Sequence, residues 1–184
     1  MAADMIILGE YHGYAVSVNV LAHAVLRIDP ECQFVVTGGD DVFPSKELPP
    51  DEIAAQCTAH FSGTLGIMQP CGDRHMVDED GRCAAERVTI SPWMGREWVK
   101  RAYMGKGPLC EAYTHSYVDE DLHNVAERVG LLWHRRDLTQ YHDWHGSKGE
   151  PEPEHMKRHH GEFETGKRIF LERKAADFPG SEFL

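Results

Sequence analysis

The sequence has little of what marks a membrane-spanning or disulfide-bonded protein. No apolar run in its 184 residues approaches the roughly 20 residues that span a bilayer, and the start, 1–4, lacks the basic residues of a secretory leader. The five cysteines are widely spaced and contain no Cys-x-x-Cys pair, which is typical of reduced thiols rather than of a disulfide framework or a structural zinc site. We therefore expect a cytoplasmic protein that makes no membrane contact.

Positive charge is also scarce. The chain has 19 Lys and Arg against 30 Asp and Glu, a formal net charge of -11. A wide phosphate-binding surface needs clustered Lys and Arg, so the composition gives no support to a nucleic-acid partner, although it leaves room for a local basic pocket. The length suits one domain with a single sizeable core.

Predicted strands and helices alternate along the chain. The apolar patterns predict strands at 5–8, 33–37, 65–69, 87–90 and 131–133, and helices at 14–28, 51–61, 94–103 and 119–129. This alternation indicates an α/β fold, a three-layer sandwich around a mostly parallel central sheet. Ligands of such sheets bind beyond the carboxyl ends of the strands.

The composition changes after residue 145. The stretch 146–166 is rich in Gly, Pro, Glu and His, which predicts a polar loop followed by a short terminal element at 169–171. We therefore divide the chain into a main domain, 1–145, and a C-terminal extension, 146–184, whose loop could close over a ligand and exclude water.

Two adjacent carboxylates, Asp40 and Asp41, directly follow the strand predicted at 33–37. Neighbouring carboxylates repel each other, and a divalent cation such as magnesium or manganese is the usual compensation. The competing interpretation is a solvated Asp-Asp turn, since Asp is common in turns.

Two further patterns carry ionisable groups. The start of a predicted helix carries three acids, Asp119, Glu120 and Asp121. Either they interact favourably with the positive end of the helix dipole, or one of them is a general base. His142 and His145 form a His-x-x-His pair that could present two imidazoles to one metal ion, or could lie exposed in a polar loop. No His-Glu-x-x-His motif accompanies them, which argues against a zinc protease.

In order along the chain, these motifs resemble those of GT-A nucleotide-sugar glycosyltransferases. A helix that contains Asn19 leads into a hydrophobic strand that ends in Asp40 and Asp41, at the place of the family's Asp-x-Asp metal motif. The segments that continue the series are Ile90-Ser91-Pro92-Trp93-Met94-Gly95-Arg96, Gly105-Lys106-Gly107, Val118-Asp119-Glu120-Asp121-Leu122 with Arg128 and Gly130, and finally His142 and His145. The resemblance covers roughly Gly13 to His145. In the family a nucleotide-recognising half precedes the Asn-bearing helix, whereas only about a dozen residues precede it here.

The resemblance implies a truncated GT-A-like fold and an enzyme that transfers a sugar from a nucleotide diphosphate sugar to a hydroxyl acceptor with Mn²⁺ or Mg²⁺. It also implies a role for each matched residue. Asp119, or Glu120 beside it, would be the catalytic base; Asp40, Asp41 and Asn19 would bind the donor; Asp41, His142 and His145 would hold the metal; and Trp93, Arg96, Asp73 and Arg74 would line the acceptor side. A homodimer would shelter the exposed edge strand of such a truncated sheet.

Two other classes of protein stay open at this stage. One is a glycosyltransferase-like binding or scaffold protein without turnover, which the short N-terminal part favours. The other is a small metal-dependent hydrolase that uses the aspartates and histidines and needs no nucleotide. Metal binding that depends on a nucleotide diphosphate would separate the transferase from both.

Overall fold

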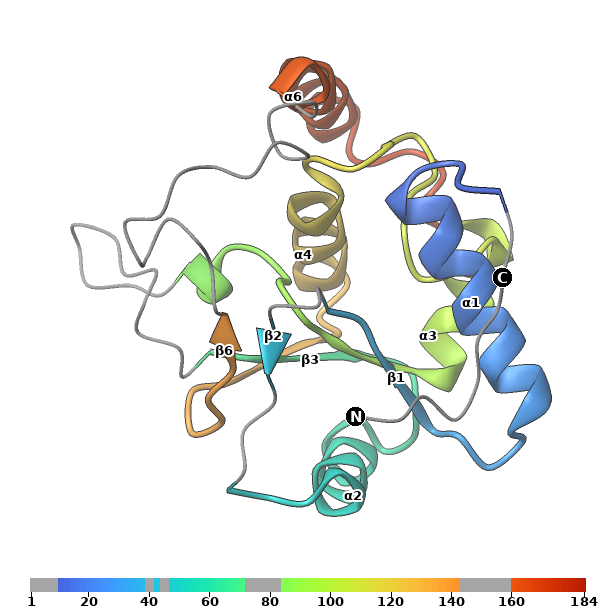
Figure 1. Ribbon diagram of the computed structural model, residues 1–184, viewed down its shortest axis with the longest axis vertical. Coiled ribbons are helices and arrows are strands. Elements are labelled where there is room, and N and C mark those ends of the chain that lie inside the picture. Colours follow the sequence, from blue (N-terminus) through green and yellow to red (C-terminus); the bar gives the residue numbers. More distant parts are fainter. Residues whose placement is uncertain (1–9, 39–41, 44–46, 72–83, 143–159) are drawn as a thin grey trace.

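A computed structural model describes residues 10–38, 42–43, 47–71, 84–142 and 160–184. These residues form a four-stranded sheet with helices on both of its faces, and a separate two-stranded sheet lies at one side (Figure 1). The strand predicted at 5–8 and the polar stretch 146–159 lie outside the described residues.

The central sheet is mixed. It contains β1 (Phe34–Val36), β4 (Trp93–Gly95), β3 (Ile67–Pro70) and β5 (Leu132–Arg135) in that spatial order. β4 runs antiparallel to both of its neighbours, β1 and β3, and only β3 and β5 pair in parallel. The prediction of an α/β fold is confirmed, but the prediction of a mostly parallel sheet is wrong.

The reason lies in the connections between the strands. Parallel neighbours need a long crossover, usually a helix, and helices do stand between β1 and β3 and between β3 and β5. Between β3 and β4 the described residues contain only one 3₁₀ turn, η1 (Ala84–Glu86). β4 lies beside β3 in the opposite direction. As a result β1, β3 and β5 end at the same edge of the sheet, and β4 begins there.

The strand predicted at 87–90 is also wrong. These residues form a turn and bends, because Thr89 bonds to a helix instead of a strand: its amide and its hydroxyl both donate to the carbonyl of Asp119, at 3.5 and 3.0 Å. The strand comes later, at Trp93, and the next helix therefore begins at Arg96 rather than at Met94. A side chain on Gly95 would collide with the carbonyl oxygen of Thr64, so only glycine lets β4 lie this close to the loop before β3.

Three helices follow the predicted patterns closely: α1 (Tyr14–Ile28), α2 (Pro50–Phe61) and α4 (Val118–Arg128). α2 has Pro50 in its first turn, where the missing amide hydrogen costs nothing. After α4 the chain turns through Gly130, whose φ of +72° suits glycine.

The C-terminal helix α6 (His160–Ala175) is longer than the short element predicted at 169–171, and its first residues correct the loop prediction for 160–166. Glycine disfavours helices by about 1 kcal/mol, and Gly161 and Gly166 made this segment resemble a loop. Packing explains Gly166, because a Cβ there would lie 2.4 Å from the carbonyl oxygen of Ser116. Glycine allows α6 to approach the loop that precedes α4.

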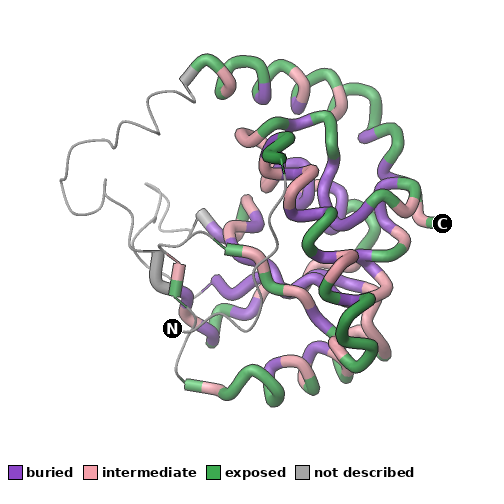
Figure 2. The backbone as a smooth tube through the Cα atoms, turned by 45° about the vertical axis from the view of Figure 1, so that its right-hand side comes forward, coloured by how far each residue is buried: buried purple, intermediate pink, exposed green. Residues whose placement is uncertain are grey.

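Two apolar clusters pack on opposite faces of the sheet. The larger one joins α1, α3 (Arg96–Gly105), α4 and α6 to the face that carries Ile67 and Met94. The smaller one joins α2 to the face that carries Phe34, Met68 and Trp93. Burial is densest where the sheet meets the helices, and α6 exposes much of its outer side (Figure 2). Among the described helices none has the length and apolarity needed to cross a membrane.

A fully buried carboxylate, Asp121, connects the helices of the larger cluster. The hydroxyls of Tyr103 and Tyr113 donate to its two oxygens at 2.9 and 3.0 Å, and Nε of Arg173 donates at 2.7 Å. These donors come from α3, from the loop before α4 and from α6. The C-terminal extension is thereby joined to the core of the main domain.

The change Asp121→Asn should lower the free energy of unfolding by about 3 kcal/mol, because it leaves the mostly buried guanidinium of Arg173 without a compensating charge. Urea denaturation of the variant and of the parent chain measures this. The control is Glu172→Gln, which breaks the exposed pair of Arg168 and Glu172 and should cost no more than about 0.5 kcal/mol. Equal losses in both variants would contradict the role of Asp121.

Candidate functional site

Several segments that are distant in sequence meet where β1 ends and β4 begins. The hydroxyl of Ser91, before β4, donates to the carbonyl of Thr37, after β1. Nε2 of Gln140 donates to the carbonyl of Ser91 at 2.9 Å, and Thr89 bonds to Asp119 in the first turn of α4. The carboxyl end of β1, the entry to β4 and the start of α4 therefore form one connected surface.

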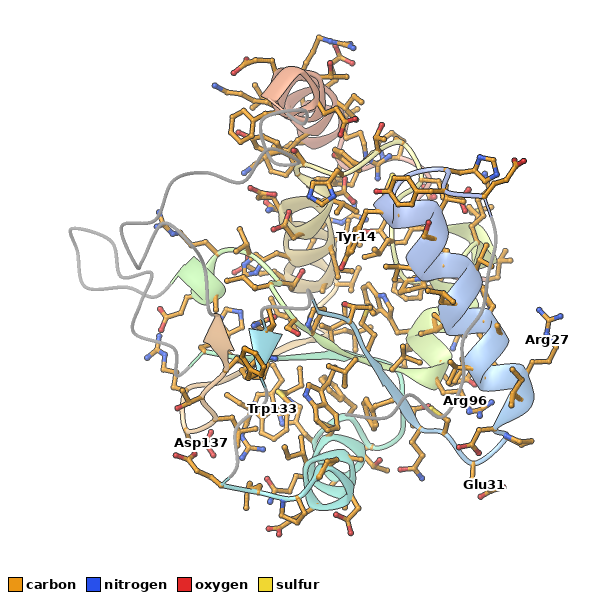
Figure 3. The ribbon with its side chains drawn as sticks, viewed as in Figure 1. Tyr14, Arg27, Glu31, Arg96, Trp133 and Asp137 are labelled. Atoms are coloured by element: carbon orange, nitrogen blue, oxygen red, sulfur yellow. The ribbon has the colours of Figure 1, made fainter. Side chains whose placement is uncertain are left out.

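Tyr14 reaches this surface from the first turn of α1. Its hydroxyl shares a hydrogen bond with the side chain of Thr37, and its ring meets that of His115 edge to face at 5.6 Å. Burial raises the pKa of Tyr14, and the nearby negative charge of Asp119 raises it further. Tyr14 is thus an un-ionised hydroxyl beside the acids of α4 (Figure 3).

Asp119 and Glu120 form a carboxyl pair in which Glu120 holds the proton. Burial, a hydrogen bond with Asp119 and the charge of Asp119 together raise the pKa of Glu120 to about 9. Its Oε2 is buried and has no hydrogen-bond partner within the described part of the chain. Glu120 therefore keeps its proton at neutral pH.

A second, two-stranded sheet brings the segment after the predicted metal aspartates beside a predicted metal histidine. β2 (Val42–Phe43) pairs antiparallel with β6 (Tyr141–His142), with Val42 opposite His142. Val42 directly follows Asp41 in the chain, so two segments about 100 residues apart meet at this point. The sequence patterns predicted both ligands but not this pairing.

Other predicted site residues lie outside the described residues: Asp40, Asp41, Asp73, Arg74 and His145, together with the side chain of His142. Within the described ranges no group of three or more His, Cys, Asp or Glu residues could hold a metal ion. The structure therefore leaves the predicted metal ligands as predictions.

Asn19, predicted to bind the donor, is buried and holds a loop against α1. Its Nδ2 donates to the carbonyl of Leu109 at 3.0 Å and to Oε1 of Glu111 at 3.3 Å, and its Oδ1 accepts from the amide of Leu109 at 3.0 Å. A Cβ on Gly107, whose φ is +136°, would lie 2.7 Å from Cγ of Asn19. These contacts satisfy the amide without a nucleotide, and its role in donor binding stays a prediction.

Arg96 and Trp93, predicted for the acceptor side, also have structural contacts. The guanidinium of Arg96 donates to the carbonyls of Asp29, Pro30 and Cys32 at 2.7 to 2.9 Å, which caps the end of α1 and the turn into β1 (Figure 3). Trp93 is 8% exposed and packs with the cluster beneath α2. These contacts account for both residues without a ligand, and their acceptor roles stay predictions.

Sequence reasoning missed the polar residues that connect the site, namely Tyr14, Thr37, Thr89, Ser91 and Gln140. One pattern could have indicated Thr37, since it ends a predicted strand directly before Gly38. A Cβ on Gly38 would lie 2.8 Å from the hydroxyl of Ser91, so the glycine lets the two segments approach.

Comparison with protein-family models, curated proteins and solved structures finds no match.

The raised pKa of Glu120 predicts a specific dependence of stability on pH. Above about pH 4.5 an unfolded chain loses the proton of this carboxyl group, whereas the folded chain keeps it up to about pH 9. The contribution of Glu120 to stability therefore falls as pH rises between these values. Since Gln carries no charge in either state, Glu120→Gln should gain stability relative to the parent chain as pH rises from about 5 to about 9.

Urea denaturation at three pH values across that range measures the difference between the two chains. Glu52→Gln, at an exposed position of α2, serves as the control, and its difference from the parent should stay constant. A difference that is also constant for Glu120→Gln would show that Glu120 is ionised in the folded protein.

Proposed function

We propose that the chain is a metal-assisted glycosyltransferase of a short GT-A-like form, which moves a sugar from a nucleotide diphosphate sugar to a hydroxyl acceptor. The observation that carries the proposal is the pairing of β2 with β6. It places the residue after Asp41 opposite His142, while Thr37, three residues before Asp40, bonds to Tyr14, whose pKa is raised in part by the charge of Asp119. These contacts support one site that combines the predicted metal ligands with the predicted base.

The donor set suits the proposed cation. Asp40 and Asp41 would supply the hard carboxylate oxygens that magnesium and manganese prefer, and His142 would add an imidazole. When bound, the ion would neutralise the charge that develops on the leaving diphosphate. The pairing of Val42 with His142 supports this ligand set, because Val42 directly follows Asp41 in the chain.

The carboxyl pair of α4 supplies the base. Asp119 takes the proton of the acceptor hydroxyl as that oxygen bonds to the anomeric carbon and the bond to the diphosphate breaks. Attack from the face opposite the leaving group inverts the anomeric centre. Glu120, which stays protonated, donates a hydrogen bond to Asp119 and keeps the two carboxyl groups from repelling each other.

Binding and turnover are tested separately. Calorimetric titration with uridine and guanosine diphosphates should give binding only with Mn²⁺ present, and Asp40→Ala and Asp41→Ala should abolish it. Asp51→Ala, an exposed acid of α2, is the matched control and should bind as the parent does. Asp119→Asn should keep nucleotide binding but lower the rate of transfer from uridine or guanosine diphosphate sugars at least about 100-fold, since it removes the base.

The same experiment distinguishes the competing functions. A folded chain that binds neither nucleotide under any condition would contradict the transferase and favour a binding or scaffold protein. Metal binding that is equal with and without nucleotide would favour a hydrolase.

A further inference from the structure

A cavity of about 520 Å³ opens beside the carboxyl pair of α4. Its wall is made by three segments: the turn that follows η1, one side of α4, and the second half of α6. Its size falls within the range of about 300–1,000 Å³ that is usual for small-molecule sites. Glu120 forms part of the wall, so the cavity borders the candidate site.

Two groups of the wall contain buried polar atoms without partners. His123 is 4% exposed, and its Nδ1 has no hydrogen-bond partner in the described part of the structure. Oε2 of Glu120, three residues earlier on α4, is also buried and has no hydrogen-bond partner among the described residues. Leaving such atoms unpaired costs about 1–3 kcal/mol each. Both atoms are closed to solvent, and a small rotation of either side chain toward the cavity would let it pair with a hydroxyl, which both donates and accepts.

Both groups are uncharged. Burial lowers the pKa of His123, and the neighbouring ring of His134, whose centroid is 5.4 Å away, lowers it further. Glu120 keeps its proton. The interior wall therefore offers neutral hydrogen-bonding groups rather than a fixed charge.

The charged groups of the wall cancel one another. Two carboxylates, Glu86 and Glu127, face two cations, Arg87 and Lys174. Glu86 is also paired with Arg136 at 2.8 Å, and Oε2 of Glu127 lies 4.0 Å from Nε2 of His123. Among the described residues of the wall these charges sum to zero, which favours a neutral ligand over a phosphate or an ammonium group.

We propose that this cavity binds a neutral, polyhydroxylated ring, the sugar of a carbohydrate acceptor, and holds one of its hydroxyls toward Glu120, the member of the carboxyl pair that lines it. The part that concerns the acceptor rests on the proposed transferase function; binding of the sugar itself does not. Val88 and Phe170 supply apolar wall for the faces of the ring, while His123 and Asn124 supply groups for its hydroxyls.

The experiment records ¹⁵N–¹H spectra of the full chain without nucleotide or metal. The probes are the methyl glycosides of glucose, galactose and mannose, with glucosamine and glucuronate as charged counterparts. At least one neutral glycoside should shift the amides of 86–88 and 120–127 in a saturable way, and the two charged sugars should bind more weakly. Glu127→Ala, which removes a carboxylate acceptor, and Val88→Trp, which fills the cavity, should each raise the Kd about tenfold.

Glu164→Ala, an exposed position of α6 outside the cavity wall, is the control and should bind the glycoside as the parent chain does. No saturable shift with any of the neutral glycosides would overturn the proposal, as would tighter binding of a charged sugar or an unchanged Kd in both cavity variants. Sugar binding in a chain that binds no nucleotide would leave this inference standing and refute the transferase. Nucleotide binding without sugar binding would overturn this inference and leave the transferase proposal standing.

Discussion

The buried carboxylate of Asp121 is the constraint on which the arrangement of the helices depends. A charge with no exposure needs compensation from groups that reach it, and the groups that do come from α3, from the loop before α4 and from α6. Successive residues of a helix point about 100° apart. Anchoring Asp121 in the interior therefore also sets the directions of Asp119 and Glu120 at the start of the same helix.

The three acids of this helical turn have three different environments. Asp121 is buried and paired with a guanidinium and two hydroxyls, Glu120 is half-buried and has a strongly raised pKa, and Asp119 lies near enough to raise the pKa of Tyr14. A helix dipole alone would stabilise all three in the same way. The raised pKa of Glu120 gives the pair at 119 and 120 the asymmetry that proton transfer needs.

The part of the fold that could be predicted is the part in which local pattern and tertiary packing agree. α1, α2 and α4 have apolar residues at helical spacing and clear end residues, such as Pro50 and Gly130, and their bounds were predicted to within one residue. The errors arose where contacts distant in sequence decide the outcome. Thr89 bonds to α4 rather than to a strand, and α6 forms despite Gly161 and Gly166 because the glycine at 166 allows close packing.

The sequence by itself determined which residues could carry chemistry, because the two aspartates, the acids of α4 and the His-x-x-His pair are visible as residue types at set spacings. Only the tertiary structure decided what those residues meet. It placed Val42 opposite His142 and it buried Oε2 of Glu120, and it assigned Asn19 and Arg96 to backbone carbonyls of neighbouring segments. Strand pairing and burial join positions far apart in the chain, and no spacing along the sequence records which distant group a side chain will contact.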